Sequence, residues 1–408
     1  MFVAIMGYGV IGSGVAALLK QNRELICKRA NTDSIEVKYI LDLRTFPGDP
    51  NEHLVINDFQ KIVSDPEVKI VVETMGGLKP AYDFVLACLN AGKSVVTSNK
   101  ELVAAKGSEL LAAAKANNVN FMFEASVGGG IPIIRPITRC LAANEIIEIA
   151  GILNGTTNFI LTKMIEEGMD FDDALAVAQK LGYAEKNPSA DVDGIDALRK
   201  ICILGSLCFG KHIYPENIYA EGIRGITAED VAYAKSYNSV IKLIASASKI
   251  EGSDKINIMV SPAIIKNGSQ LASTRDVFNA VLVRGNAVGD VVFYGKGAGS
   301  LPTASAVVAD VMDCALHSDC TKLFGWEDTK ENITADHAEF VAPFYVRADC
   351  EKSKIDASFG NTVTYINCEG APAGEIAFAT EPIKVKDLEA KLASIGVQAK
   401  SIIRITDY

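Results

Sequence analysis

Residues 3–12, VAIMGYGVIG, decide the fold of the first part of the chain. An apolar run typical of a strand ends at Gly7, and a helical pattern follows from residue 13. The turn Gly7-Tyr8-Gly9-Val10-Ile11-Gly12 has the spacing G-x-G-x-x-G. In this context Gly7 permits the tight turn, Gly9 lets a pyrophosphate approach the backbone, and Gly12 lets helix and strand pack closely. The stretch predicts a dinucleotide site; the alternative is an ordinary glycine-rich turn.

The alternation of strands and helices continues to about residue 145. We expect further strands at 37–43, 68–75, 93–98 and 119–126, and helices at 13–21, 79–91, 101–117 and 132–142. Near-continuous apolar strands between helices indicate a doubly wound parallel sheet. We therefore predict an α/β Rossmann domain over residues 1–145, completed by a helix within 300–320.

The pattern changes after residue 145. A strand at 145–153, helices at 157–167, 171–181 and 193–209, and strands at 256–265, 277–284 and 288–294 predict an α+β substrate and dimerisation domain over 146–299. Residues 321–340 are the expected linker. Residues 341–408 follow the order strand, short connection, strand, strand, helix, strand, which predicts a small ferredoxin-like α+β unit.

Composition excludes several classes of partner. The net charge of -10 opposes binding to nucleic acid or to an anionic membrane surface, and a small-molecule substrate is favoured. The nine cysteines contain no C-x-x-C pair, as expected of buried thiols in a reducing compartment. No run is long enough for a membrane span or a signal peptide, so we expect a cytoplasmic protein.

The second strand carries the expected signal for cofactor choice. An acid at its end usually binds the ribose hydroxyls of NAD, and a nearby arginine can hold the 2′-phosphate of NADP. Asp42 and Arg44 supply one of each. This pair favours NADP slightly, or the use of both cofactors.

Three later segments narrow the function. They are VTSNKE (96–101), EASVGGGIP (124–132) with GILNGTTN (151–158), and GYAE (182–185) with DVDGIDALRK (191–200). Together with GAGSLPTA (297–304), and in this order, they resemble the homoserine dehydrogenase family over roughly residues 2–318. One departure is Lys186, which stands where the family usually has proline.

The resemblance implies a role for each matching residue. Lys200 would donate a proton in reduction and accept one in oxidation, and Lys100 would assist between cofactor and substrate. Glu185 and Asp196 would bind the substrate's ammonium group, with Asp191 in support. Further cofactor contacts would come from Thr97, Lys100, Gly182 and Gly299.

The residues themselves allow a simpler interpretation of the third segment. Asp193, Asp196 and Lys200 lie at i, i+3 and i+7 of the expected helix, so they share one face. Without the resemblance, that face would be interpreted as a solvated one with an Asp196–Lys200 ion pair worth only a few tenths of a kcal/mol.

The turn at 124–132 holds three consecutive glycines, which let backbone oxygens converge on a hard cation. The resemblance implies a monovalent cation, Na+ or K+, bound mostly through main-chain oxygens of Glu124, Val127, Gly129 and Ile131. The alternative is a tight strand-to-helix turn without an ion.

The C-terminal unit, residues 341–408, resembles an ACT domain. Such a unit would bind an amino-acid effector such as threonine, or it would serve only in packing. The family resemblance further implies a homodimer or homotetramer.

Two rival functions remain open at this point. The first is another semialdehyde or amino-acid dehydrogenase, which would need a cysteine–histidine pair if it were acylating. The second is a catalytically silent nucleotide sensor with a regulatory tail.

Overall fold

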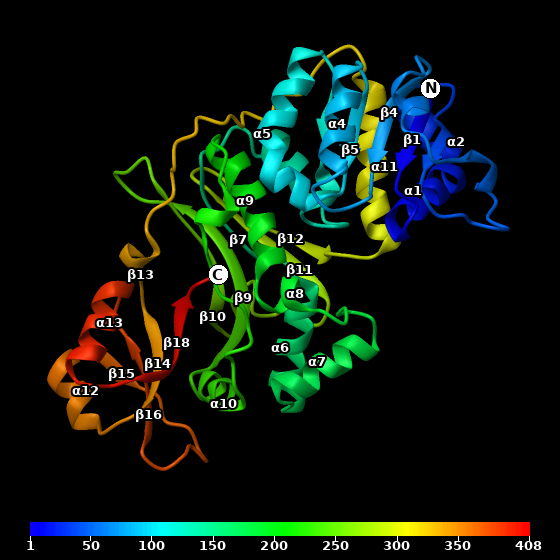
Figure 1. Cartoon of the computed structure of the whole chain (residues 1–408). Coiled ribbons are helices and arrows are strands. Elements are labelled where there is room, and N and C mark those ends of the chain that lie inside the picture. The colour runs from blue at the N-terminus through cyan, green and yellow to red at the C-terminus, as the bar shows by residue number, and fades with distance from the viewer. The chain divides into compact units, whose positions relative to one another are not determined.

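The computed structural model describes residues 1–408, and the chain divides into two compact units (Figure 1). Unit 1 comprises Met1–Asn144, Cys202–Pro215 and Gly295–Asn332. Unit 2 comprises Glu145–Ile201, Glu216–Tyr294 and Ile333–Tyr408. Each unit is therefore assembled from segments that are far apart in the sequence.

Unit 1 is built on a six-stranded parallel sheet with the order β3-β2-β1-β4-β5-β6. Its strands are β1 (Phe2–Met6), β2 (Glu36–Leu41), β3 (Val55–Ile56), β4 (Val68–Glu73), β5 (Ser94–Thr97) and β6 (Phe121–Met122). The order reverses between β1 and β4, where a doubly wound sheet binds its ligand beyond the carboxyl ends of the strands. The predicted Rossmann-type fold is confirmed.

The helices of unit 1 are α1 (Val10–Gln21), α2 (Arg23–Arg29), α3 (Gln60–Val63), α4 (Ala81–Asn90), α5 (Lys100–Ala116) and α11 (Ser300–Leu316). Figure 1 shows α11, in yellow, returning beside α1, and a Cβ on Gly14 would lie 3.3 Å from that of Ala304. The helix expected over 132–142 is wrong in its extent, since only a short π-helical turn, Pro136–Cys140, forms there. Pro136 cannot donate a backbone hydrogen bond inside a longer helix.

Unit 2 contains a mixed sheet with the order β12-β11-β7-β9-β10-β18-β14-β16-β15, and β8 pairs with β10. Its first strands are β7 (Ile146–Ile152), β8 (Tyr219–Ala220), β9 (Ser239–Lys249), β10 (Ile256–Lys266), β11 (Phe278–Gly285) and β12 (Gly289–Lys296). The sequence pattern does not predict β9, whose small and polar residues Ser246, Ala247 and Ser248 dilute the apolar run. The helices of this part of the chain are α6 (Gly155–Glu167), α7 (Phe171–Lys180), α8 (Ser189–Val192), α9 (Ile195–Phe209) and α10 (Ala228–Ser236).

The C-terminal segment forms β14 (Phe344–Asp349), α12 (Lys352–Phe359), β15 (Val363–Tyr365), β16 (Glu375–Thr380), α13 (Val385–Ser394) and β18 (Ala399–Thr406), with β13 (Val341–Ala342) paired to β17 (Ile383–Lys384). The strand order β18-β14-β16-β15 is that of a ferredoxin-like β-α-β-β-α-β unit. Helix α12 replaces the short connection expected there, because Ile355 and Phe359 lie one turn apart and both are buried.

This segment is joined to the rest of unit 2 rather than separate from it. Strand β18 pairs in parallel with β10, which makes the sheet continuous. The buried Arg347 guanidinium donates to Asp230 of α10 at 2.8 Å and to Glu375 of β16 at 3.0 Å. A regulatory domain with a boundary at residue 341 stays a prediction.

Two further features bear on the protein's setting. None of the helices combines the length and the apolar character that crossing a bilayer requires. All nine cysteines are free thiols.

Candidate active site

The turn from Gly7 to Gly12, here called the nucleotide turn, owes its shape to its glycines. Gly7 has φ +92°, and a Cβ there would lie 2.9 Å from backbone atoms of Thr74 and Met75. A Cβ on Gly12 would lie 2.0 Å from the Gly7 oxygen. A Cβ on Gly9 would meet nothing within 4 Å, so the space above this residue is open. The turn is closed toward the protein at Gly7 and Gly12 and open at Gly9, as a pyrophosphate site requires.

Helix α1 begins at Val10 beside this open space. Gly9 supplies no side-chain cap, so no side chain of this residue competes with an anion for the first-turn N–H groups. Ser300 Oγ donates to the Val10 oxygen at 2.8 Å, which brings Gly299 (φ +120°) next to the nucleotide turn. Ile11 is half-buried and packs against the core of the same unit.

Asp42 and Arg44 form a closed ion pair after β2. Arg44 donates to both Asp42 carboxylate oxygens, from Nε at 3.0 Å and from the second guanidinium nitrogen at 2.9 Å. Tyr8 N also donates to Asp42 Oδ2 at 2.8 Å, so this acid is attached to the nucleotide turn. The Arg44 guanidinium holds the pKa of the Asp42 carboxyl well below its usual range, against the opposing effect of partial burial. The predicted cofactor-selecting pair is thus one assembled unit.

The carboxyl ends of β4 and β5 carry a buried polar group that the sequence did not reveal. Glu73 is fully buried, and its carboxylate accepts from Thr97 Oγ1 at 2.6 Å and from Met75 N at 2.8 Å. Burial raises the pKa of Glu73, although these hydrogen bonds act against the rise. Thr97 Oγ1 in turn accepts from Asn99 N at 2.9 Å, and Asn99 caps α5, which begins at Lys100. Glu73 therefore fixes the segment that carries Thr97 and Lys100.

In unit 2, Lys200 lies in a cluster that joins three segments. Its Nζ donates to Asp196 Oδ2 at 2.7 Å and to the Leu153 backbone oxygen at 2.7 Å. Asn154 Nδ2 donates to Asp196 Oδ2 at 2.9 Å and to Asp191 Oδ1 at 2.7 Å. We call Leu153, Asn154, Asp191, Asp196 and Lys200 the acid–lysine cluster.

The geometry of this cluster differs from the solvated helix face that the residue spacing alone would suggest. The Asp196–Lys200 pair is buried, with side chains 7% and 9% exposed. Asp193 does not share the face, because α9 begins only at Ile195 and Asp193 instead ends α8. Its exposed carboxylate pairs with Arg224. The segment GILNGTTN contributes to the family resemblance, but its pattern assigns no role to Asn154.

Two predicted site residues lie on an exposed loop between α7 and α8. Gly182 has φ +77°, and Glu185 is exposed and makes no hydrogen bond to the cluster through its carboxylate. The Glu185 backbone oxygen accepts from Gln179 Nε2 at 3.0 Å. The structure thus gathers Asp191, Asp196 and Lys200 and leaves Glu185 available to a ligand.

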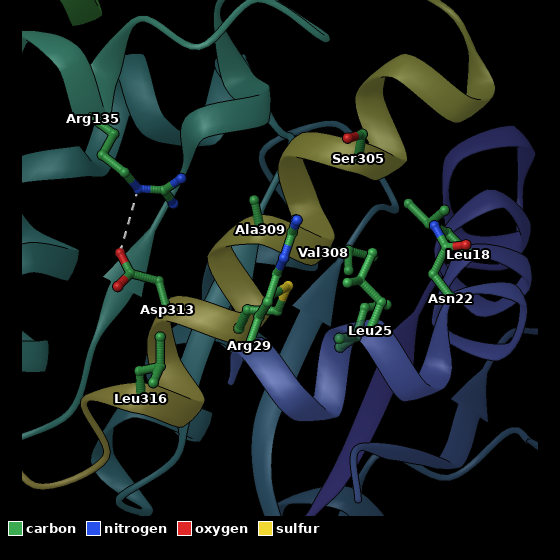
Figure 2. A pocket seen from close by; sticks show the side chains of 12 residues that line it. Leu18, Asn22, Leu25, Arg29, Arg135, Ser305, Val308, Ala309, Asp313 and Leu316 are labelled. Carbon is green, nitrogen blue, oxygen red and sulfur yellow. Dashed lines mark ion pairs between the residues drawn. The ribbon is translucent and has the colours of Figure 1, made fainter. Parts of the chain in front are cut away.

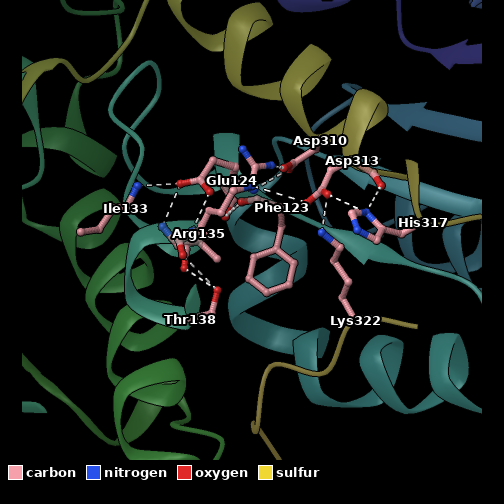
Figure 3. A network of polar contacts seen from close by, with 11 residues as sticks. Phe123, Glu124, Ile133, Arg135, Thr138, Asp310, Asp313, His317 and Lys322 are labelled. Carbon is pink, nitrogen blue, oxygen red and sulfur yellow. Dashed lines mark hydrogen bonds and ion pairs between the residues drawn. The ribbon is translucent and has the colours of Figure 1, made fainter. Parts of the chain in front are cut away.

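The glycine-rich turn at 124–132 belongs to unit 1 and rests on a buried polar network (Figure 3). The Glu124 carboxylate accepts from the backbone N–H groups of residues 133, 134 and 135 at 2.6, 2.8 and 2.8 Å. Asp310 of α11 accepts from Glu124 N at 2.8 Å and from the Arg135 guanidinium at 2.6 Å. Burial, reinforced by the nearby Glu124, raises the pKa of Asp310 to about 8.

This arrangement limits which atoms could hold a cation. The Glu124 side chain already accepts three backbone hydrogen bonds, which favours the main-chain oxygens of Glu124, Val127, Gly129 and Ile131 as the predicted ligands. Gly129 has φ +57°, and a Cβ there would lie 2.3 Å from the Gly297 oxygen, so glycine is required for this close approach. No group of three or more histidine, cysteine or acidic side chains could hold a metal ion.

A groove in unit 1 lies elsewhere and contains none of the predicted site residues. It has a volume of about 420 Å³ and lies between α2 and α11, where Leu25 and Leu316 are partly exposed (Figure 2). Arg135 and Asp313 pair at one end of it.

Comparison with known proteins supports one family over most of the chain. The family model "Homoserine dehydrogenase, NAD binding domain" matches residues 7–124, and the model "Homoserine dehydrogenase" matches residues 132–312. A homoserine dehydrogenase of Synechocystis sp. is 45% identical over 315 residues, which cover 76% of this chain and 72% of that relative.

Solved structures of homoserine dehydrogenases are also similar to this chain. A homoserine dehydrogenase of Thiobacillus denitrificans has a TM-score of 0.90 and 36% identity, covering 100% of this chain and 98% of that one. A hyperthermophilic archaeal homoserine dehydrogenase in complex with NADPH has a TM-score of 0.65 and 30% identity, covering 77% and 97%. With these matches, the nucleotide turn of unit 1 and the buried Asp196–Lys200 pair of unit 2, the chain belongs to the homoserine dehydrogenase family of NAD(P)-dependent oxidoreductases.

Proposed function

We propose that Lys200, Asp196 and Glu185 carry the reaction of this family in the present chain, the reversible NAD(P)-dependent interconversion of L-homoserine and L-aspartate 4-semialdehyde. The observation that supports this assignment is the buried Lys200 ammonium, which the Leu153 oxygen and Asp196 hold at 2.7 Å each. A flexible surface lysine would have no such fixed orientation. This is the step that leads toward threonine and methionine.

Each of these residues has a proposed role in the reaction. The nicotinamide, when bound, supplies or accepts the hydride. In reduction, Lys200 donates a proton from Nζ to the oxygen that becomes the homoserine hydroxyl, and in oxidation it removes that proton. Lys100 assists in polarising the carbonyl. The substrate's ammonium group is bound by Glu185, with Asp191 and Asp196 contributing negative charge.

The cofactor groups fit the turn that the structure shows. Backbone N–H groups of Val10, Ile11 and Gly12 at the start of α1 would hold the pyrophosphate. Arg44 is 62% exposed and could turn from Asp42 toward a 2′-phosphate, whereas Asp42 could accept from ribose hydroxyls. We therefore propose that the enzyme uses NADP and also accepts NAD.

A monovalent cation, Na+ or K+, is part of the proposal. Its ligands would be main-chain oxygens of the turn at 124–131, and its charge would organise that turn without entering the reaction.

Assembly and regulation are proposed from the family and from the C-terminal topology. The ferredoxin-like segment 341–408 would act as an ACT-like unit, with threonine as the candidate effector, in a homodimer or homotetramer. The nine free thiols support a reducing cytoplasm as its location.

The assignment is tested by Lys200→Ala. Turnover of homoserine, followed by nicotinamide absorbance, should fall by about 10²- to 10⁴-fold because the proton acceptor is lost. Binding of reduced cofactor, followed by its fluorescence, should persist, since the nucleotide turn is unchanged. Lys180→Ala, at the exposed end of α7, is the matched control and should behave as the unmodified protein.

Two outcomes would contradict the proposal. Near-normal turnover in Lys200→Ala would remove the lysine from the chemistry. Cofactor binding with no homoserine-dependent absorbance change in the unmodified protein would favour the silent sensor instead.

A further inference from the structure

Asn154 has two chemically different sides, and both are used. It follows β7 and begins α6, where its Oδ1 accepts from Thr157 N at 2.8 Å and from Thr157 Oγ1 at 3.0 Å. These contacts fix the amide, because a flipped group would set its NH2 against the Thr157 N–H donor. Its Nδ2 must therefore point to the other side.

That other side receives two carboxylates from different helices. Asn154 Nδ2 donates to Asp191 Oδ1 of α8 at 2.7 Å and to Asp196 Oδ2 of α9 at 2.9 Å. The two hydrogens of one NH2 group are thus shared between two acids that would otherwise repel each other. Capping of α6 requires only Oδ1, so these contacts exceed what a helix cap needs.

The same contacts reach the lysine. Asp196 Oδ2, which accepts from Asn154, also accepts from Lys200 Nζ at 2.7 Å. The second Nζ contact is the oxygen of Leu153, the residue that precedes Asn154. The turn at 153–154 therefore holds Lys200 both directly and through Asp196.

We propose that Asn154 is a positioning residue for the reaction: its NH2 group orients Asp191 and Asp196 and divides the charge of Asp196 between itself and Lys200. This inference rests on the proposed function of Lys200. Without the NH2 donor, more of the negative charge of Asp196 acts on Lys200 and favours its ammonium form. Homoserine oxidation needs the neutral amine, so its rate should then rise only at higher pH.

The test compares Asn154→Ser with Thr157→Val. Serine retains an N-cap oxygen but cannot donate to both acids, whereas Thr157→Val removes one hydroxyl from the cap side and leaves the NH2 contacts. For Asn154→Ser we expect kcat for homoserine oxidation to fall on the order of 10- to 100-fold. We also expect the acid limb of its pH profile to move upward by about one unit. Thr157→Val should keep the original profile.

Asn154→Asp provides a second variant that retains the cap oxygen. It adds a negative charge beside Asp196 and Lys200 and should move the pH profile further than Asn154→Ser does. If Asn154→Ser folds poorly, the shift is measured in this variant.

The outcomes separate the two hypotheses. An unchanged kcat, KM and pH profile in folded Asn154 variants, with Lys200→Ala inactive, would overturn only the positioning role. Retained turnover in Lys200→Ala would instead overturn the proposed function.

Discussion

The nucleotide turn and the acid–lysine cluster hold their shapes by opposite means. In the turn, the absence of side chains sets the shape: a Cβ on Gly12 would lie 2.0 Å from the Gly7 oxygen, which belongs to the same turn. In the cluster, side chains from 154, 191, 196 and 200 converge through hydrogen bonds of 2.7 to 2.9 Å. The first is a local property of the backbone, and the second depends on how unit 2 folds.

This difference predicts how each region responds to substitution. A change in the nucleotide turn should act on cofactor affinity or on local packing, one glycine at a time. A substitution in the cluster should affect several of its residues at once, because Asp196 Oδ2 accepts hydrogen bonds from both Asn154 and Lys200.

The largest effect on stability is expected for Asp196→Ala. The Lys200 ammonium would keep its burial and lose its ion-pair partner, a loss that typically costs about 3–5 kcal/mol in a buried pair. The free energy of unfolding should fall accordingly, and homoserine turnover should drop by about 10²-fold or more. Denaturant unfolding and nicotinamide absorbance measure the two effects.

Asp193→Ala is the matched control, since Asp193 lies on the turn just before α9 and its exposed carboxylate pairs with Arg224. It should change stability by less than about 1 kcal/mol. If Asp193→Ala lowered the free energy of unfolding as much as Asp196→Ala does, the buried cluster would be no more important for stability than the exposed ion pair.

Within the nucleotide turn, Gly9→Ala and Gly12→Ala should differ from each other. The Cβ added by Gly9→Ala would meet no protein atom within 4 Å, so the melting temperature of the free protein should not change. The same Cβ would occupy the space proposed for the pyrophosphate, so cofactor affinity should fall about tenfold, or ~1.4 kcal/mol. Gly12→Ala forces helix and strand apart and should cost about 1–3 kcal/mol of stability. Thermal melting with and without cofactor separates the two, and a stability loss in Gly9→Ala would contradict the open geometry.

The contrast also explains what the sequence could predict. The parallel sheet and the glycine roles follow from local periodicity and spacing, which the short stretch VAIMGYGVIG already displays. The Asp196–Lys200 pair was predicted from i, i+4 spacing, but its burial was not, because burial depends on what unit 2 packs around it. Asp193 was misplaced because the expected helix boundary fell slightly too early, and boundaries are the least certain feature of a periodic pattern.

Glu73 and Asn154 show which site residues are hardest to predict from the sequence. Each satisfies partners on segments distant in sequence, such as Thr97 for Glu73 and Asp196 for Asn154. For Glu73 a sequence signal existed but was not used: an acid inside the apolar run 68–75, which is expected to be buried, needs a partner, because acids are rarely buried without one. For Asn154 the sequence gave no role beyond membership of the segment GILNGTTN, and both its helix-capping oxygen and its NH2 contacts are seen only in the structure.

The smallest effect is expected for Arg44→Ala. Arg44 and Asp42 form a side-chain pair, as in the acid–lysine cluster, but this pair adjoins the backbone of the nucleotide turn. Arg44 occupies both Asp42 oxygens, and Tyr8 N connects Asp42 to the turn. Removing the guanidinium frees Asp42 to accept from ribose hydroxyls and removes the candidate partner of a 2′-phosphate. The ratio of kcat/KM for NADP over NAD should fall about three- to tenfold, while the homoserine KM stays constant, because the acid–lysine cluster is untouched. Measuring both cofactors on both proteins with one substrate preparation gives this ratio directly. A constant ratio would mean that Arg44 serves only to hold Asp42, and the turn would then select its cofactor through backbone geometry alone.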